Sequence, residues 1–455
     1  MAANKPSLPK GTRDFGPQQM AKRNYIFDTI RSTFQKFGYM PLETPSMENL
    51  SVLTGKYGDE GDQLLFKILN SGDFMKKATE QDVAEGSKAM LPKIAEKGLR
   101  YDLTVPFARY VVMNQNELTM PFKRYQIQPV WRGDRPQHGR YREFYQCDAD
   151  VVGTDSLICE AEIVLMILEV LGNLGLKDYE IKINHRQVLA GITEAAGAPG
   201  REGDFCVAID KLDKIGEEKV MEELAERGFD QSAIEKVQPL LSLAGNSQEK
   251  MEFLKTYMAA SEAGQKGLTE LAQVWEYLKD FGTEAPQLVF DPTLARGLSY
   301  YTGCIFEVKP TSVKMGSISG GGRYDNLTGV FGLSGVSGVG FSFGVDRIYD
   351  VLEELNLFPE DNTVGVKVMI TNFDEASEKH ALGLLGKLRQ AGIASEIFPQ
   401  AAKMKKQFNY ADKKNIPYVL LVGEKEVAEG SYGLKNMKSG DQEMMSLDQI
   451  IAHLQ

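Results

Sequence analysis

Two strand-like runs flank a loop rich in arginine, and this segment constrains the fold more than any other part of the chain. The runs cover Arg124 to Val130 and Phe144 to Val152, and the loop between them contains Arg132, Arg135, Arg140 and Arg142. The pattern predicts an antiparallel hairpin that presents guanidinium groups. Such groups bind phosphate bidentately and stack on flat rings. The segment therefore favours anion or phosphate binding over a solvated charged hairpin.

The length and composition of the chain narrow the class of protein. A chain of 455 residues exceeds one ordinary core, so two or three domains are expected. Hydrophobic residues at 42% and charged residues at 25% are typical of a globular protein, and no apolar run is long enough for a bilayer. Residues 1–10 lack the apolar region of a signal peptide, so we expect a cytoplasmic protein with no membrane partner. The net charge of −11 disfavours a generic nucleic-acid coat protein.

Neither metal nor disulfide chemistry finds support in the pattern of the sequence. The four cysteines are scattered and form no C-x-x-C pair, so we expect reduced thiols without zinc. The four histidines show no metal-ligand spacing, and we expect each to be solvated or locally satisfied. The sequence has no G-x-S-x-G elbow and no P-loop. An ATP site in this chain would therefore lie on a different kind of loop.

The pattern of strand-like, helix-like and glycine-rich stretches changes three times along the sequence. These changes predict four segments. Residues 1–188 mix strands with helical stripes, such as Ile26, Ile30, Phe34 and Phe37. Residues 189–286 consist of short, charged, helix-favouring stretches, which predict a helical insertion. Strand and glycine signals return over 287–357.

The last segment, 364–455, follows a break at Pro359 and looks self-contained. Strands and helices alternate in it, which predicts a small α/β domain with largely parallel pairing. Its final helix begins at Ser446, with Gln449 completing a capping box.

Three further stretches contain residues suited to ligand binding. Leu294 to Gly303 places Arg296 in a glycine-bounded turn before two tyrosines. Gly320 to Asp325 begins with three glycines, which indicate either close approach of a ligand or a flexible turn. Gly338 to Arg347 reads as a glycine-rich strand that leads into a helix.

In this order, the segments resemble those of the class II aminoacyl-tRNA synthetases, and specifically the histidyl-tRNA synthetases. The extended segment ending at Pro45 is similar to motif 1, which builds the dimer interface, and the arginine hairpin is similar to motif 2. Gly340 to Arg347 is similar to motif 3. Leu294 to Gly303 and Gly320 to Asp325 resemble the stretches that single out the histidine enzymes. The resemblance implies an α+β fold: an antiparallel-sheet catalytic domain with a helical insertion, followed by a C-terminal α/β anticodon-binding domain.

The resemblance also implies roles for individual residues toward ATP and tRNA. Arg132 and Arg296 would hold the α-phosphate of ATP from opposite sides. Phe144 and Arg347 would sandwich adenine, and Mg²⁺ would accompany ATP. The residues that would contact the acceptor end of the tRNA are Arg135, Gln137 and Arg140.

A second set of residues would bind the amino acid. Asp102, Thr104 and Gln146 would receive the α-amino group of L-histidine. Asp150 and Tyr301 would bind its two imidazole nitrogens, with Tyr324 lining the pocket. Since neutral imidazole has one donor and one acceptor nitrogen, a carboxylate and a hydroxyl can satisfy both.

The implied reaction makes histidyl-adenylate from L-histidine and ATP, and then charges tRNA-His. A homodimer is expected. Two departures from the family pattern stand out: Ser299 where many members have Asp, and Asp102 and Asp150 where bacterial members often have Glu. Two alternatives remain, an inactive synthetase-like regulatory subunit of histidine biosynthesis and a synthetase for another amino acid. The retained arginines and full C-terminal segment disfavour the first, and the Asp150–Tyr301 pair disfavours the second.

Overall fold

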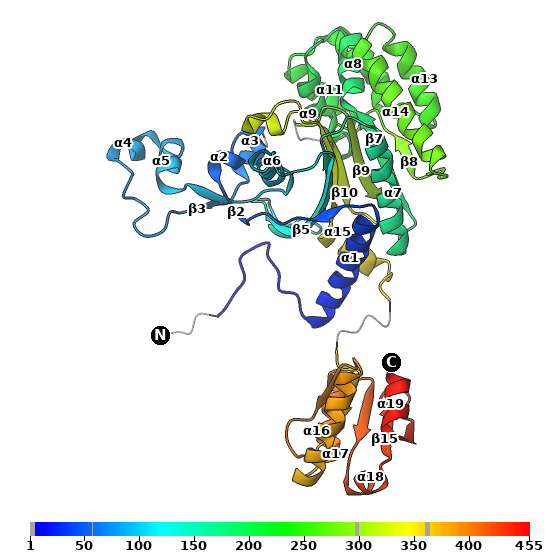
Figure 1. Cartoon of the computed structure of the whole chain (residues 1–455). Coiled ribbons are helices and arrows are strands. Elements are labelled where there is room, and N and C mark those ends of the chain that lie inside the picture. Colours follow the sequence, from blue (N-terminus) through cyan, green and yellow to red (C-terminus); the bar gives the residue numbers. More distant parts are fainter. Residues whose placement is uncertain (1–4, 57, 296–299, 360–364) are drawn as a thin grey trace. The chain divides into compact units, whose positions relative to one another are not determined.

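The computed structural model describes residues 5–56, 58–295, 300–359 and 365–455. The chain divides into two compact units, Met1–Pro359 and Glu360–Gln455, and Figure 1 shows the elements of each. Across the described ranges, no helix is both long enough and apolar enough to cross a membrane.

An eight-stranded mixed sheet forms the centre of the first unit. Its strands, in spatial order, are β1 (Met40–Pro41), β5 (Phe122–Trp131), β6 (Glu143–Val152), β11 (Gly338–Gly344), β10 (Ser319–Tyr324), β9 (Cys304–Pro310), β7 (Tyr179–His185) and β8 (Leu288–Phe290). The outermost pairings, β1 with β5 and β7 with β8, are parallel, and those between them are antiparallel. The arginine segment forms the predicted hairpin, with Arg124 opposite Asp150. The antiparallel sheet predicted for this domain is therefore confirmed.

One face of this sheet packs on helices. Alternate residues of β6, Cys147, Ala149 and Val151, are fully buried because neighbouring side chains of a strand point to opposite faces. The helices α1 (Pro17–Lys36), α7 (Ile158–Asn173) and α15 (Val345–Glu354) cover this face. The ring of Phe34, in the predicted stripe of α1, lies 6.0 Å from that of Phe341.

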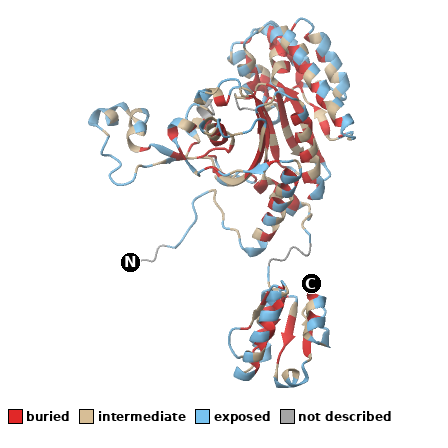
Figure 2. Cartoon of the chain, viewed as in Figure 1, coloured by how far each residue is buried: buried red, intermediate tan, exposed pale blue. Residues whose placement is uncertain are grey.

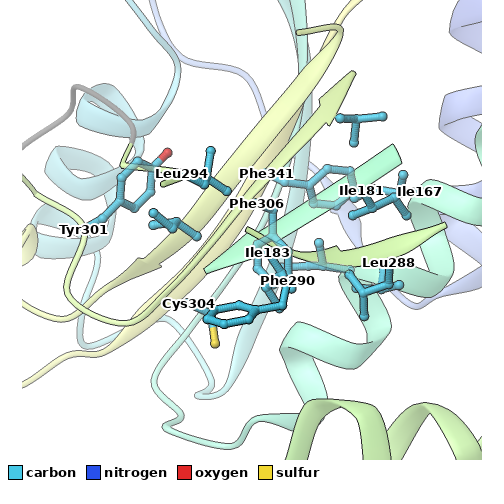
Figure 3. Packing of buried hydrophobic residues seen from close by; sticks show 14 of the residues in the cluster. Ile167, Ile181, Ile183, Leu288, Phe290, Leu294, Tyr301, Cys304, Phe306 and Phe341 are labelled. Carbon is cyan, nitrogen blue, oxygen red and sulfur yellow. The ribbon is translucent and has the colours of Figure 1, made fainter. Parts of the chain in front are cut away.

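The buried residues of the first unit concentrate on the central strands and on the inner sides of these helices, as Figure 2 shows. Phe306 and Phe341 both lie in register with Gly321, so their side chains leave the sheet on the helix-covered face. They pack together with Ile183 from the neighbouring strand (Figure 3). The opposite face of the same strands stays open for polar side chains.

Residues after β7 form a group of helices with no strand among them until β8. They are α8 (Arg186–Ala196), α9 (Glu202–Ile209), α10 (Leu212–Ile215), α11 (Glu217–Glu226), α12 (Gln231–Leu241), α13 (Ser247–Tyr257) and α14 (Glu262–Asp280). Within this group, α8 packs against α14 and against α12. Val188, Ile192 and Leu271 are among the buried residues of these helices. The helical insertion of the expected fold is thus present.

A smaller sheet and a set of short helices lie beside the central sheet. The sheet consists of β2 (Met47–Asn49), β4 (Lys97–Leu99) and β3 (Lys67–Ile68). The helices are α2 (Leu50–Leu53), α3 (Gly58–Gln63), α4 (Glu80–Glu85), α5 (Ser87–Ile94), α6 (Thr104–Met113) and the short 3-10 helix η1 (Thr328–Phe331). A separate hydrophobic cluster joins α2 and α6 to the end of β10, with Leu53, Phe107 and Tyr324 among its buried members.

The second unit is a five-stranded α/β domain. Its strands run in the order β13 (Ser395–Ile397), β12 (Val368–Ile370), β14 (Tyr418–Leu421), β15 (Tyr432–Asn436) and β16 (Gln442–Met445). Its helices are α16 (Glu375–Gln390), α17 (Met404–Lys413), α18 (Glu424–Glu429) and α19 (Leu447–Leu454). The capping box at Ser446 is present: the Gln449 side chain accepts from the Ser446 amide at 2.9 Å.

Strand pairing in this unit is less parallel than the sequence predicts. β13, β12 and β14 are parallel, but β14, β15 and β16 pair antiparallel. Short connections cause the difference, since residues 437–441 are too few for the crossover that a parallel pair needs.

Candidate active site

The open face of the central sheet forms the floor of a cavity of about 440 Å³. Phe144, Gln146, Asp148 and Asp150 all line it, because alternate residues of β6 share this face. The cavity lies within the size range of small-molecule sites. The helical insertion also contributes to the lining, through Asp210.

Glycines in the strands of the cavity floor leave space for the side chains of neighbouring residues, because they have no Cβ. Gly340 pairs with Asp150 across β6 and β11, and a Cβ added at Gly340 would lie 2.1 Å from Oδ1 of Asp150. A Cβ at Gly322 would lie 2.8 Å from the Tyr301 ring. The three glycines Gly320 to Gly322 therefore sit in a strand, not in a flexible turn, and Gly322 leaves room for the Tyr301 ring.

Asp150 is held at the bottom of the cavity by two partners. Its Oδ1 accepts a hydrogen bond from the Tyr324 hydroxyl at 2.7 Å, and its Oδ2 lies 2.7 Å from Nη2 of Arg124. Burial raises the pKa of Asp150, while the positive charge of Arg124 and the Tyr324 hydrogen bond oppose that rise. Burial also raises the pKa of Tyr324 well above its ordinary value, so this hydroxyl remains a donor. The pair fixes the orientation of a buried carboxylate in the cavity.

Two tyrosines and the polar residues at the N-terminus of α6 line the cavity together with Asp150. The rings of Tyr300 and Tyr301 lie 4.7 Å apart, and Tyr300 meets Tyr324 edge-on. Asp102 accepts from the amide of Val105 at 3.1 Å, and so lies beside the first turn of α6. Thr104, the first residue of α6, also lines the cavity. The structure thus brings all six residues proposed for histidine binding to one cavity.

Asp148 is a further pocket carboxylate that sequence reasoning did not single out. It lies between Gln146 and Asp150 on the pocket face and is 2% exposed. Its pKa is raised to about 7, mainly by burial; the positive charge of Arg124 opposes this rise, and the nearby charge of Asp150 adds to it. Period-two alternation from Gln146 to Asp150 would have identified it.

The arginine hairpin forms the other end of the cavity. The guanidinium of Arg132 lies 4.3 Å from the Tyr101 ring centre and 5.2 Å from that of Phe144. Its Nε donates to the Tyr101 carbonyl at 3.1 Å. Arg347, in the first turn of α15, donates from Nε to the Gly139 carbonyl at 2.7 Å and so connects to the hairpin turn.

The start of α15 is anchored by arginines from the N-terminal region. Asp346 pairs with Arg13 and, at 2.7 Å, with Arg23, and it accepts from the amide of Tyr145 at 2.9 Å. The guanidinium of Arg13 also stacks 3.4 Å from the Tyr141 ring centre. These contacts fix the hairpin against α15, and the sequence reasoning assigned them no role.

The remaining predicted residues lie at the rim or outside the described residues. Arg135 and Gln137 are exposed, and Arg140 pairs with Asp134 at 2.8 Å. Gln137 and Arg140 close the hairpin turn through a pair of backbone hydrogen bonds. Arg296 and Ser299 lie outside the described residues.

Comparisons with known proteins identify the family that the chain resembles. Residues 11–348 match the model of the histidyl-tRNA synthetase family, and residues 366–455 match that of an anticodon-binding domain. The histidine–tRNA ligase of Cytophaga hutchinsonii is 59% identical over 450 residues, with 99% of each chain covered. That of Phocaeicola vulgatus is 56% identical, again with 99% of each covered. The crystal structure of histidyl-tRNA synthetase from Nostoc sp. PCC 7120 is 30% identical and superposes with a TM-score of 0.82, covering 98% of this chain and 99% of that one.

The antiparallel sheet, the arginine hairpin and the glycine-rich strand leading into α15 define a class II aminoacyl-tRNA synthetase. The family match covers most of the chain, and close relatives match it over nearly their full length. The chain therefore belongs to the histidyl-tRNA synthetase family and is an aminoacyl-tRNA ligase. The regulatory-subunit alternative is not favoured.

Proposed function

We propose that the cavity activates L-histidine with ATP and transfers it to tRNA-His, with the residue roles given below. One observation carries the assignment to histidine: a buried carboxylate, Asp150, lies over the glycine floor between Arg124 and Tyr324. Next to it, Tyr301 lines the same cavity.

Imidazole suits this pair of groups. A carboxylate accepts from the N–H of the ring, and the Tyr301 hydroxyl donates to the other nitrogen. Because Asp150 is only 2% exposed, an amino acid without a ring donor would forgo a charge-assisted hydrogen bond to a buried carboxylate. Discrimination of roughly 10⁴-fold is within reach of such a site without editing.

The activation step is an in-line substitution at phosphorus. A carboxylate oxygen of histidine forms a bond to the α-phosphorus of ATP, and the bond from that phosphorus to its bridging oxygen breaks, which releases pyrophosphate. Arg132, beside the Tyr101 and Phe144 rings, holds the α-phosphate, and Arg296 does so from the other side. Preorganised guanidinium groups stabilise the charge that develops there. Phe144 and Arg347 enclose adenine.

Mg²⁺ would accompany ATP, and the donor set of the cavity fits such an ion. Glu307 lines the cavity and pairs with Gly320 across β9 and β10, so its carboxylate stands on the pocket face. Mg²⁺ prefers oxygen ligands and is commonly held by one or two carboxylates together with substrate phosphates. Glu307 would be the protein ligand, and the ion would neutralise phosphate charge.

The tRNA is held at two places in this proposal. The hairpin residues Arg135, Gln137 and Arg140 contact the acceptor end, and the second unit reads the anticodon. Exposed lysines on and beside α17 support the latter role; they are Lys403, Lys405, Lys406, Lys413 and Lys414. We place this reaction in the cytoplasm, where tRNA is charged for translation.

A homodimer completes the proposal. β1 is an edge strand that contains Pro41, and its Met40 is 56% exposed. An uncovered apolar edge is an association surface. Light scattering should return about twice the 50.6 kDa of the chain, and a monomer mass at working concentration would contradict this.

The assignment of Asp150 is tested by Asp150→Asn in histidine-dependent ATP–pyrophosphate exchange. We expect kcat/KM for histidine to fall by ~100-fold, because a charged acceptor of the ring is lost. Asp155→Asn, an exposed carboxylate in the turn after β6, is the matched control and should keep parental kinetics. An Asp150→Asn enzyme within threefold of the parent would reject the role.

A further inference from the structure

Two buried acceptor atoms on β6 face the cavity without a partner. Oδ1 of Asp148 and Oε1 of Gln146 have no hydrogen-bond partner among the described residues, although the Gln146 amide nitrogen donates to Ser342 at 2.8 Å. Asp148 is 2% exposed. Buried polar atoms are normally paired, and an unpaired carboxylate oxygen is costly.

The spacing and chemistry of these atoms point to a cationic group. Residues two apart on a strand have Cα atoms roughly 7 Å apart and point the same way. A single group of hydrogen-bond donors can lie between their side chains. An ammonium offers three donors and no acceptor, so it can satisfy both oxygens at once.

We propose that Asp148 receives the α-ammonium group of L-histidine, together with Gln146. The inference rests on the proposed function, because it deepens the recognition of the same substrate. Asp148 thereby becomes a binding residue for the amino acid, next to Asp102 and Thr104 and separate from the imidazole contacts of Asp150.

The charges around Asp148 support this assignment. The groups that face it are Arg124 from β5, Asp150 on its own strand, Asp102 from the segment before α6 and the Ser342 hydroxyl from β11. Three carboxylates thus share one guanidinium, and Nη2 of that guanidinium is already 2.7 Å from Asp150. Burial holds the pKa of Asp148 at about 7. An incoming ammonium supplies the missing positive charge and favours the ionised form.

Two other roles for Asp148 predict different behaviour. If Asp148 contacted the imidazole, any ligand with that ring would lose affinity when the carboxylate is neutralised. If Asp148 only positioned Arg124, the Asp150 contact would suffer, and the ring would again be affected. Only an ammonium contact singles out ligands that carry the α-amino group.

The decisive experiment compares two ligands on the full-length chain by calorimetry. The ligands are L-histidine and 3-(imidazol-4-yl)propionate, which keeps the ring and carboxylate but has no amino group. For Asp148→Asn we expect histidine to bind at least ~30-fold more weakly and imidazolepropionate to stay within threefold. Equal losses for both ligands would overturn the inference. Asp155→Asn is the matched control, and unchanged ATP affinity shows that the variant is folded.

A second measurement follows the protons. Because burial raises the pKa of Asp148 to about 7, histidine binding at pH 7 should release more protons from the parent than from Asp148→Asn, which has no carboxyl at this position to ionise. Calorimetry in two buffers of different ionisation enthalpy measures this difference, and the contribution of the ligand's own ring cancels because the ligand is the same. Equal proton release would contradict the inference. Failure of the parent to bind histidine at all would instead reject the proposed function.

Discussion

The first unit buries the carboxylates Asp148 and Asp150 of its cavity, whereas the second unit displays the basic side chains of α17 to solvent. Arg124, the partner of Asp150, is 0% exposed and lies 2.7 Å from it. On α17, Lys405 and Lys406 are exposed, and the neighbouring Lys414 pairs with Glu396 at 3.0 Å on the surface. Pairs of basic and acidic side chains therefore occur in two environments, one buried and one exposed to solvent.

The difference shows which charges carry information about function. A buried charge costs several kcal/mol unless it is well paired, so its presence in a fold demands a reason. An exposed ion pair contributes about 0–1 kcal/mol and needs none. In the proposed function, ligand binding supplies the reason for the pocket carboxylates, but exposed lysines are equally consistent with a solvated helix. Variants should consequently affect the two regions in different ways.

The largest effect is expected where charge develops during the reaction. Arg132→Ala should lower kcat for ATP–pyrophosphate exchange by roughly 10²–10³-fold while histidine affinity stays nearly unchanged. Arg296→Ala should show the same signature. Exchange kinetics and direct histidine titration measure the two quantities. Retention of kcat within a few-fold would remove the arginines from the phosphate site.

Removal of the second unit should separate the two halves of the reaction. Truncation after Leu357 leaves the cavity intact, since every residue that lines it precedes this point. We expect tRNA charging to fall by at least ~100-fold while histidine-dependent exchange survives, because phosphate and anticodon contacts would be lost. A folded fragment that charges tRNA as efficiently as the parent would contradict the division of roles.

Steric change at the floor of the cavity should weaken histidine binding without altering its charge. In Gly340→Ala the new methyl group would lie 2.1 Å from Oδ1 of Asp150, so that carboxylate must move. We expect KM for histidine to rise by roughly 10–100-fold, since a displacement of about 1 Å can cost that much. Gly383→Ala, on α16, meets no atom within 4 Å and is the matched control.

The smallest effect is expected from the exposed lysines. Replacing Lys405, Lys406 and Lys413 together by Gln should weaken tRNA binding by roughly tenfold at low salt and flatten its salt dependence. The melting temperature should stay unchanged, because none of these side chains is buried. An identical salt slope in the variant and the parent would show that this helix face is only solvated.

The sequence predicts the framework of the site better than its interior. The strands around the arginine loop, the stripe of α1 and the motif leading into α15 follow from periodicity, which the buried faces enforce. Alternation along β6 could have identified Asp148, but Arg124 could not be ranked in advance, because its importance comes from pairing with Asp150 across strands β5 and β6. Likewise, Arg13 and Arg23 meet Asp346 from more than 300 residues away in the chain.

The C-terminal unit gives the complementary lesson. The sequence pattern locates its strands, but the antiparallel addition of β15 and β16 depends on the short turn between them and on Leu434 packing into the core. The three glycines of β10 were equally consistent with a turn, and only their pairing with β9 and β11 places them in a strand. The local sequence pattern thus identifies where a strand lies, whereas its direction and its neighbours in the sheet depend on the strands with which it pairs.

Recognition of the imidazole ring by Asp150 and Tyr301 underlies the proposed specificity for histidine, and ATP–pyrophosphate exchange with each of the twenty amino acids tests it most directly. Histidine should support exchange, and every other amino acid should fall below it by roughly 10⁴-fold in kcat/KM, since each would leave buried polar groups unpaired. Comparable exchange with a second amino acid, or none with histidine, would contradict it.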